Sequence, residues 1–215
     1  MKKTKTLFKQ ISEIFIGCVI LVSLPLLSMA IGNELKTNEN CNLTITDSVF
    51  IPSTNYLMDS VRNELIAEVE NYVFKTFPTT HKTIPTSIVE NALEHEVDIV
   101  FMMAQTQIET AFGTTGAGRQ TSRRSLFGVA FKKYDSYENA IKDYLRILKK
   151  FYLGNGRTEQ HLMNNYTTKS GARYAANPKY EIELKNAYKN ISNKTTIKSL
   201  QNQYKELCMT KEDKY

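Results

Sequence analysis

The fold is decided around the stretch DIVFMMAQTQIETAFG, residues 98–113. Asp98 suits an N-cap because its side chain can accept a hydrogen bond from the first helical turn, and Gly113 suits a helix end. We therefore expect a helix over Ile99–Phe112. One residue in it is unusual, because Glu109 lies in the last turn, where the negative end of the helix dipole favours Lys or Arg.

The helical neighbours of Glu109 contain no compensating base. At spacings of three, four and seven they are Met102, Gln105, Thr106 and Phe112. The dipole, the apolar neighbours and the lack of a local cation all favour the protonated form of this carboxyl group. A general acid needs such a group to protonate a glycosidic oxygen near neutral pH. A solvated glutamate at a helix end is the alternative.

Helical signals continue toward the N-terminus. Apolar residues recur at helical spacing from Leu57 until Pro78 and predict one helix. Thr86 or Ser87 is a start signal for a second, short helix that ends at about Glu96. Both precede the helix that carries Glu109.

The C-terminal half also has the helical pattern. We expect a loop over residues 114–125, a helix capped by Ser136 that is broken by Gly154-Asn155-Gly156, and another that starts at Asn177-Pro178. The polar stretch from Ser192 has the pattern of one weak further helix. No alternating strand series and no internal repeat is present, so we expect a mainly α-helical domain.

The N-terminus has the pattern of an export signal. Four lysines among the first nine residues precede an uncharged run over Ile14–Ile31, and Ser28-Met29-Ala30 offers a signal-peptidase site. An uncleaved membrane anchor through residues 14–31 is the alternative. We therefore predict a signal peptide or anchor over residues 1–31 and a linker over 32–55, with the rest of the chain outside the cytoplasm.

Downstream of the linker we predict a domain over residues 56–193 and a polar tail over 194–215. Cys41 and Cys208 enclose nearly all of this part. In an oxidising compartment the two can pair, or both can stay as thiols. Three cysteines in the whole chain are too few for a disulfide scaffold.

The net charge of +6 over 215 residues is unevenly distributed. It is +3 over residues 1–31, −7 over 32–98 and +10 over 99–215. Residues 119–157 alone carry ten basic and three acidic side chains. An export signal and the lack of a base-reading motif argue against nucleic acid as a partner. A basic surface outside the cell suits anionic wall polymers or a membrane.

Signals for metals and cofactors are lacking. His81, His95 and His161 are far apart and share no ligand spacing with the cysteines. The sequence contains neither a phosphate-binding loop nor a dinucleotide fingerprint. We expect no metal and no cofactor.

Four stretches, in order, resemble the bacterial endo-β-N-acetylglucosaminidases of the autolysin and flagellar type. These are peptidoglycan hydrolases of the lysozyme-like superfamily. Residues 104–113 are similar to the family's AQ…E(S/T)xxG helix, and residues 126–129 to its NLFGI motif. Residues 134–144 resemble F-x-S-…-S-…-DY, and residues 174–184 resemble YATDPxYAxKL. The resemblance covers Pro85 to Ile191.

The resemblance implies a helical, lysozyme-like fold with a cleft for a glycan. It implies cleavage of the β-1,4 bond after N-acetylglucosamine, with Glu109 as the catalytic acid and Tyr174 as a cleft tyrosine near the scissile bond. For Phe112 and Phe127, core packing is the alternative to sugar contact. The implied substrate-binding residues are Gln105, Phe112, Phe127 and Tyr137.

The chain also departs from the family pattern. Ser125 replaces the usual Asn before Leu-Phe-Gly, and the segment between Gly128 and Tyr134 is short. We therefore expect a reduced or absent β-hairpin lobe, which in many relatives carries a second carboxylate. Residues 110–134 contain no Asp or Glu, so Asp135 and Glu138 are the nearest candidates in sequence for that chemistry, and attack by the substrate's own acetamido group is the alternative. A wall-binding module without activity, a lytic transglycosylase and a muramidase are the alternative functions.

Overall fold

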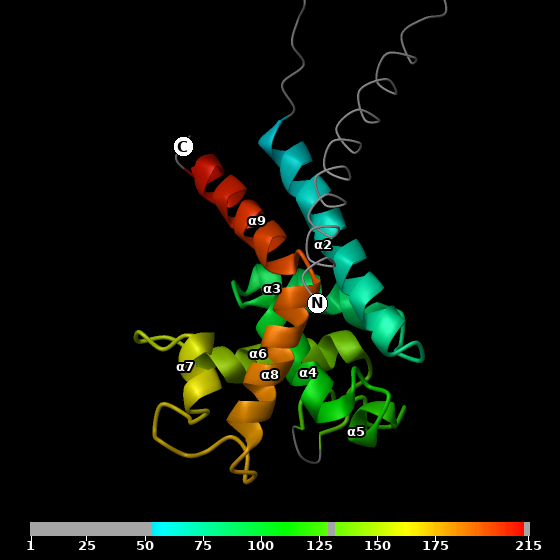
Figure 1. Cartoon of the computed structure of the whole chain (residues 1–215), viewed down its shortest axis with the longest axis vertical. Coiled ribbons are helices and arrows are strands. Elements are labelled where there is room, and N and C mark those ends of the chain that lie inside the picture. Colours follow the sequence, from blue (N-terminus) through cyan, green and yellow to red (C-terminus); the bar gives the residue numbers. More distant parts are fainter. Residues whose placement is uncertain (1–52, 129–131, 213–215) are drawn as a thin grey trace, which may run out of the picture. The chain divides into compact units, whose positions relative to one another are not determined.

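The computed structural model describes residues 53–128 and 132–212. Helices dominate this part of the chain (Figure 1). It contains no named strand, and its only pairings of the β type are the isolated bridges Gly154–Arg157 and Thr167–Arg173. The predicted mainly α fold, with a reduced or absent β-hairpin lobe, is therefore confirmed for the described residues. The helices are α2 (Thr54–Thr76), α3 (Thr83–Glu94), α4 (Ile99–Thr110), α5 (Gly116–Arg119), α6 (Tyr137–Phe151), α7 (Glu159–Asn164), α8 (Tyr180–Lys194) and α9 (Ile197–Glu212).

Helix α4 lies at the centre and is packed by α3, α5, α8 and α9. Nine of its twelve residues are buried. The Asp98 carboxylate caps it as predicted, accepting a hydrogen bond of 3.0 Å from the Phe101 N–H. Most residues of α4 before its last turn are apolar, and they point to all sides of the helix. Such a helix is stable only when other helices surround it.

Helix α4 ends at Thr110, two residues before the predicted end. Ala111 and Phe112 both adopt left-handed backbone angles, with φ of 46° and 53°. Their N–H groups return to the carbonyls of Gln107 and Thr106. These two bonds satisfy carbonyls of the last helical turns, which have no partner further along the helix.

Helix α3 begins at Thr83 and not at Thr86 or Ser87. Pro85 fits inside the first turn because no hydrogen bond to its nitrogen is needed there. Ser87 therefore lies buried in the helix interior instead of capping it. The short helices α5 and α7 were not predicted, because four and six residues are too few for an apolar stripe to stand out.

The C-terminal stretch predicted as a polar tail contains the 16-residue helix α9. It packs against α2 and α4, and α2 and α9 lie next to each other in Figure 1. Its buried Gln201 accepts a hydrogen bond from the Ile99 N–H at 3.0 Å and donates one to the Val97 carbonyl at 2.8 Å. Helix α9 thus satisfies backbone groups at the start of α4, which sequence periodicity does not reveal.

Several predictions concern residues outside the described part. These are the export signal or anchor, most of the linker, and Cys41. None of the helices within residues 53–128 and 132–212 is long and apolar enough to cross a membrane.

Candidate active site

A cavity of about 580 Å³ opens beside the C-terminal end of α4. Its walls come from α4, from α6, from the segments around Phe127 and Tyr174, and from the first turns of α8. Two carboxylates, Glu109 and Glu183, line it, and no lysine or arginine does. The lining residues are Ile108, Glu109, Phe127, Gly128, Ile147, Tyr152, Tyr174, Ala175, Ala176, Asn177, Tyr180 and Glu183.

Glu109 is partly exposed in the wall of this cavity. The Tyr180 hydroxyl donates a hydrogen bond of 2.6 Å to its Oε1 atom. Its Oε2 atom faces Gly128, where an added Cβ would lie only 2.6 Å away. Gly128 has a φ of +60°, so the position favours glycine for its backbone as well as for its space. The carboxyl group is therefore fixed from two sides.

The segment that covers Glu109 is tied to the end of α4. The Thr110 hydroxyl donates to the Leu126 carbonyl at 3.1 Å and accepts from the Gly113 N–H at the same distance. From the other side, the Tyr174 hydroxyl donates to the Phe127 carbonyl at 2.8 Å. These bonds place residues 126–128 directly over the carboxylate.

Five tyrosines pack together at the cavity, and three of them line it. We call them the tyrosine cluster: Tyr144, Tyr152, Tyr166, Tyr174 and Tyr180. Tyr174 stacks on Tyr166 with ring centroids 4.3 Å apart, and its ring centroid lies 5.2 Å from that of Tyr180. Burial raises the pKa of both Tyr174 and Tyr180, and the nearby negative charge of Glu109 raises each further. Both hydroxyls therefore keep their protons at neutral pH and act as hydrogen-bond donors.

Gln105 lies fully buried beneath the tyrosine cluster. Its Oε1 atom accepts hydrogen bonds from the Tyr144 and Tyr166 hydroxyls, which also contact each other at 2.9 Å. Its Nε2 atom has no hydrogen-bond partner among the described residues. Gln105 does not line the cavity, so its place is that of a support for the tyrosines.

An ion pair between the exposed Arg173 and the buried Glu181 holds the backbone around Tyr174. Arg173 donates to both oxygens of Glu181 at 2.9 Å, and Glu181 also accepts from the Tyr166 N–H at 3.2 Å. The backbone hydrogen bond from Tyr174 to Tyr166, at 2.8 Å, completes the connection. Although burial opposes its ionisation, these hydrogen bonds and the charge of Arg173 lower the pKa of the Glu181 carboxyl.

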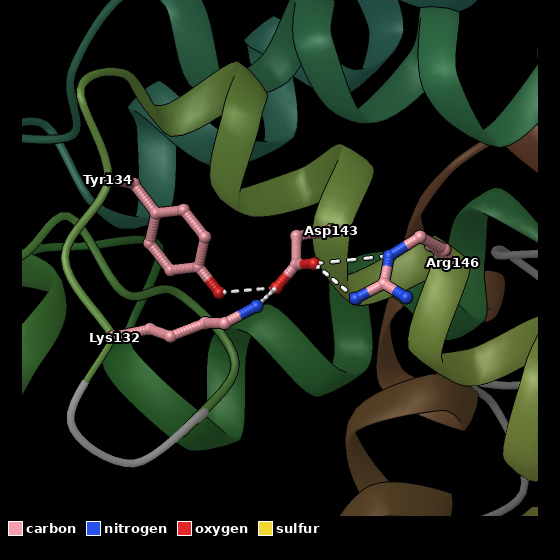
Figure 2. Close-up of polar contacts among 4 residues, drawn as sticks. All are labelled: Lys132, Tyr134, Asp143 and Arg146. Atoms are coloured by element: carbon pink, nitrogen blue, oxygen red, sulfur yellow. Dashed lines mark hydrogen bonds and ion pairs between the residues drawn. The ribbon is translucent and has the colours of Figure 1, made fainter.

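A second polar cluster ties the chain after Gly128 to α6 (Figure 2). Asp143 receives Lys132 Nζ at 2.5 Å, the Tyr134 hydroxyl at 2.8 Å and Arg146 at 2.8 Å. Burial opposes ionisation here too, but the hydrogen bonds from Lys132, Arg146 and Tyr134 outweigh it and lower the pKa of Asp143 to about 2. The ionised Asp143 therefore anchors the segment that follows the cavity wall.

Residues 86–193 match the Glucosaminidase family, described as mannosyl-glycoprotein endo-beta-N-acetylglucosaminidase. The chain belongs to this family. Comparisons with curated proteins and with solved structures gave no significant match. Membership implies a glycoside hydrolase that acts on peptidoglycan, and it confirms the resemblance on which the sequence prediction was based.

The glucosaminidase domain brings some of the predicted site residues together and leaves others apart. Glu109, Tyr174 and Phe127 line one cavity. Phe127 also stacks on Tyr144, with ring centroids 3.9 Å apart. Phe112 is fully buried against Phe77 and does not reach the cavity, because the left-handed turn after α4 directs it into the core.

Tyr137 is likewise buried away from the cavity of the glucosaminidase domain. Its hydroxyl donates to the Gly118 carbonyl at 3.0 Å, and its ring lies 5.2 Å from that of His81. The contact with Gly118 holds the loop that contains α5. Substrate contact by Tyr137 is therefore not supported by its placement.

The two carboxylates nearest in sequence, Asp135 and Glu138, do not line the cavity either. Glu138 is exposed and pairs with Lys142 at 2.6 Å. The sequence prediction missed Tyr180 and Glu183, because both were read as parts of a helix and not of a site. The signal for Tyr180 was available, since a tyrosine in a buried stripe needs a partner for its hydroxyl.

Among the described residues, no group of three or more His, Cys, Asp or Glu side chains is arranged to hold a metal ion. The lining of the cavity in the glucosaminidase domain presents carboxylates and phenols. These groups can donate and accept protons and can hydrogen-bond a sugar.

Proposed function

We propose that the protein is an exported peptidoglycan hydrolase that cleaves the β-1,4 glycosidic bond after N-acetylglucosamine, with Glu109 as the general acid. The observation that carries this proposal is the placement of Glu109 in the wall of the cavity, where Tyr180 holds it at 2.6 Å. The membership of residues 86–193 in the Glucosaminidase family supports the substrate class.

The role of Glu109 follows from its two oxygens. Oε1 accepts the Tyr180 hydrogen bond, and Oε2 lies toward Gly128 at the cavity wall. In the protonated state Glu109 gives its proton to the glycosidic oxygen as the bond to C1 breaks, so that the leaving sugar departs as an alcohol. The Tyr180 hydroxyl then stabilises the carboxylate that forms.

Tyr174 lies beside Glu109 and cannot easily ionise, because burial and the charge of Glu109 raise the pKa of its hydroxyl. Its proposed role is to orient the sugar at the scissile bond and to stabilise the positive charge that develops there. A phenol does this through the electron-rich face and oxygen that it presents.

Export is supported by the sequence of the first 31 residues. The lysine flank and the uncharged run that follows favour export of the catalytic part to the outside of the cytoplasm, where peptidoglycan is found. Membrane association through residues 14–31 is part of the same proposal, since the run can remain as an anchor.

The proposal is tested with the Glu109→Gln variant. It removes the proton donor without a change in size, so we expect circular dichroism like that of the wild type and a loss of zymogram clearing by at least a hundredfold. The matched control is Glu138→Gln, which changes an exposed glutamate outside the cavity. Retained clearing by Glu109→Gln would contradict the assignment of the general acid.

Mass spectrometry of digested peptidoglycan tests the bond that is cut. Reducing ends of N-acetylglucosamine are expected. Anhydromuramic ends would indicate a lytic transglycosylase, and N-acetylmuramic reducing ends a muramidase. Binding to purified sacculi without any product would indicate a wall-binding module.

A further inference from the structure

We propose that Glu183 is the general base that activates the attacking water, so that hydrolysis proceeds with inversion at the anomeric carbon. The proposal rests on the function proposed above and adds the second carboxylate to it. It also replaces Asp135 and Glu138, which lie outside the cavity.

The first argument is position. Glu183 lies in the first turn of α8 and lines the same cavity as Glu109. It follows Tyr180 by three residues, so the two side chains lie next to each other on the helix surface, with Cβ atoms roughly 5–6 Å apart. The hydrogen bond from Tyr180 to Glu109 fixes α8 relative to the proposed general acid, and Glu183 lies on this same helix.

The second argument is that Glu183 is available. It is exposed, and its carboxylate makes no hydrogen bond or ion pair with the described residues. Neighbouring carboxylates are engaged elsewhere: Glu181 is held by Arg173 and Asp143 by Lys132 and Arg146. A base must be able to accept a proton from water, and an engaged carboxylate does so poorly.

The third argument is spacing. Inverting hydrolysis places a water between two carboxyl groups that are about 6.5–9.5 Å apart, whereas direct nucleophilic attack needs about 5–5.5 Å. Here the Tyr180 side chain bridges the distance from α8 to the Glu109 carboxylate, and Glu183 starts one helical turn further along α8. The two carboxylates therefore reach the cavity from different helices, α4 and α8, with the Tyr180 side chain beside Glu109, and we infer the wider spacing of an inverting pair.

Glu183 is a feature of this chain and not of the motif that it otherwise resembles. In YATDPxYAxKL, the residue before the final Leu is Lys, and here that position is Glu183, followed by Leu184. A lysine could not accept the proton of the water at neutral pH. In this chain α8 thus supplies the second carboxylate that many relatives carry on the β-hairpin lobe.

The proposed step is balanced. Glu183 takes a proton from water while the water oxygen bonds to C1 from the face opposite the leaving group. The bond from C1 to the glycosidic oxygen breaks, and Glu109 protonates that oxygen. The products are a reducing sugar with inverted configuration and an alcohol, with one proton moved onto Glu183 and one off Glu109.

The experiment measures the stereochemistry and the rate on a soluble glycan of alternating N-acetylglucosamine and N-acetylmuramic acid, with the full chain. Proton NMR during the first turnovers of the wild type should show the α anomer of the new reducing end. Glu183→Gln should lose activity by about a hundredfold or more, whereas Glu138→Gln should keep it. Sodium azide should restore cleavage in Glu183→Ala, with formation of the α-glycosyl azide, because azide attacks C1 without needing a base.

The outcomes separate the two proposals. Three results would overturn Glu183 as the base: a first-formed β anomer, full activity of Glu183→Gln, or inactivity of Glu183→Ala that azide does not relieve. The β anomer would favour attack by the substrate's acetamido group. Each of these leaves Glu109 and peptidoglycan cleavage intact. Failure of the proposed function would appear instead as wild-type protein without reducing-end products, or as an active Glu109→Gln variant.

Discussion

The contact between Gly128 and Glu109 leads to a quantitative prediction. In Gly128→Ala, the new Cβ would lie 2.6 Å from Glu109 Oε2, whereas ordinary contacts begin at 3.4 Å. The carboxylate must therefore move by about 0.8 Å or more, since the glycine belongs to a backbone segment held by Thr110 and Tyr174. A misplacement of about 1 Å in a catalytic group can lower the rate about a hundredfold, and we expect a loss of that order.

The loss of stability should be much smaller than the loss of activity. Alanine at a φ of +60° costs roughly 1–2 kcal/mol because its Cβ approaches the backbone. Displacement of the partly exposed Glu109 side chain adds to this, since its bond to Tyr180 is disturbed. For a domain of this size, each kcal/mol lowers the melting temperature by about 2–4 °C, so the variant stays folded at room temperature.

The matched control is Gly116→Ala. Gly116 has a similar φ of +55°, but an added Cβ meets no atom within 4 Å. Thermal unfolding and turnover of a soluble glycan should show a comparable loss of stability in both variants and a loss of activity in Gly128→Ala alone. In a Glu109→Ala background, the stability cost of Gly128→Ala should fall to that of the control. Equal activities of the two glycine variants would refute the reasoning.

Three further substitutions test the groups around the cavity. Tyr180→Phe removes the 2.6 Å hydrogen bond to Glu109 and should lower kcat at least tenfold at unchanged circular dichroism; an unchanged kcat would show that the bond does not position the acid. Asp143→Asn should destabilise the domain by about 2 kcal/mol at neutral pH, because folding lowers the pKa of Asp143 from 3.8 to about 2. Urea unfolding should show that this difference in stability vanishes as the pH falls through that range. Glu181→Gln should lower the free energy of unfolding by about 1–2 kcal/mol at neutral pH. Because folding lowers the pKa of Glu181, this loss of stability should decrease as the pH falls below 4.5. A loss of stability that is independent of pH would contradict the Arg173 ion pair as its source.

Local signals in the sequence predicted the framework of the site correctly. Asp98 caps α4 and Ser136 caps α6, each through a hydrogen bond to a backbone N–H three residues later. The apolar residues at helical spacing in α6 are buried, since such a face is set by spacing within one helix; they are Ile141, Tyr144, Leu145 and Leu148. Glu109 was singled out for the same kind of reason, because its position at a helix end is visible within a few residues of sequence.

Contacts between distant residues could not be predicted in this way. The Tyr180 hydroxyl meets Glu109 across 71 positions, and Gln105 meets the Tyr166 hydroxyl across 61. The weak helix expected near the C-terminus turned out to be a full helix, because Gln201 meets backbone groups of Val97 and Ile99 more than 100 positions away. Such pairs depend on how helices dock, and periodicity within one helix carries no information about docking.

The C-terminal half of the chain is positively charged, whereas the residues that line its cavity carry a net negative charge. We assign the positive surface to binding of the polymer and the negative cavity to its cleavage. Residues 99–215 carry a net charge of +10, and the basic residues Lys142, Arg146, Lys149 and Lys150 of α6 are exposed. The residues that line the cavity nevertheless include two glutamates and no lysine or arginine. A positive field over a surface raises the local concentration of an anionic polymer and steers it toward the protein. A lysine or arginine inside the cavity would instead pair with Glu109 or Glu183 and occupy the carboxylates that the proposed reaction uses. The site therefore requires its positive charges to lie outside the cavity, and the described residues have this arrangement.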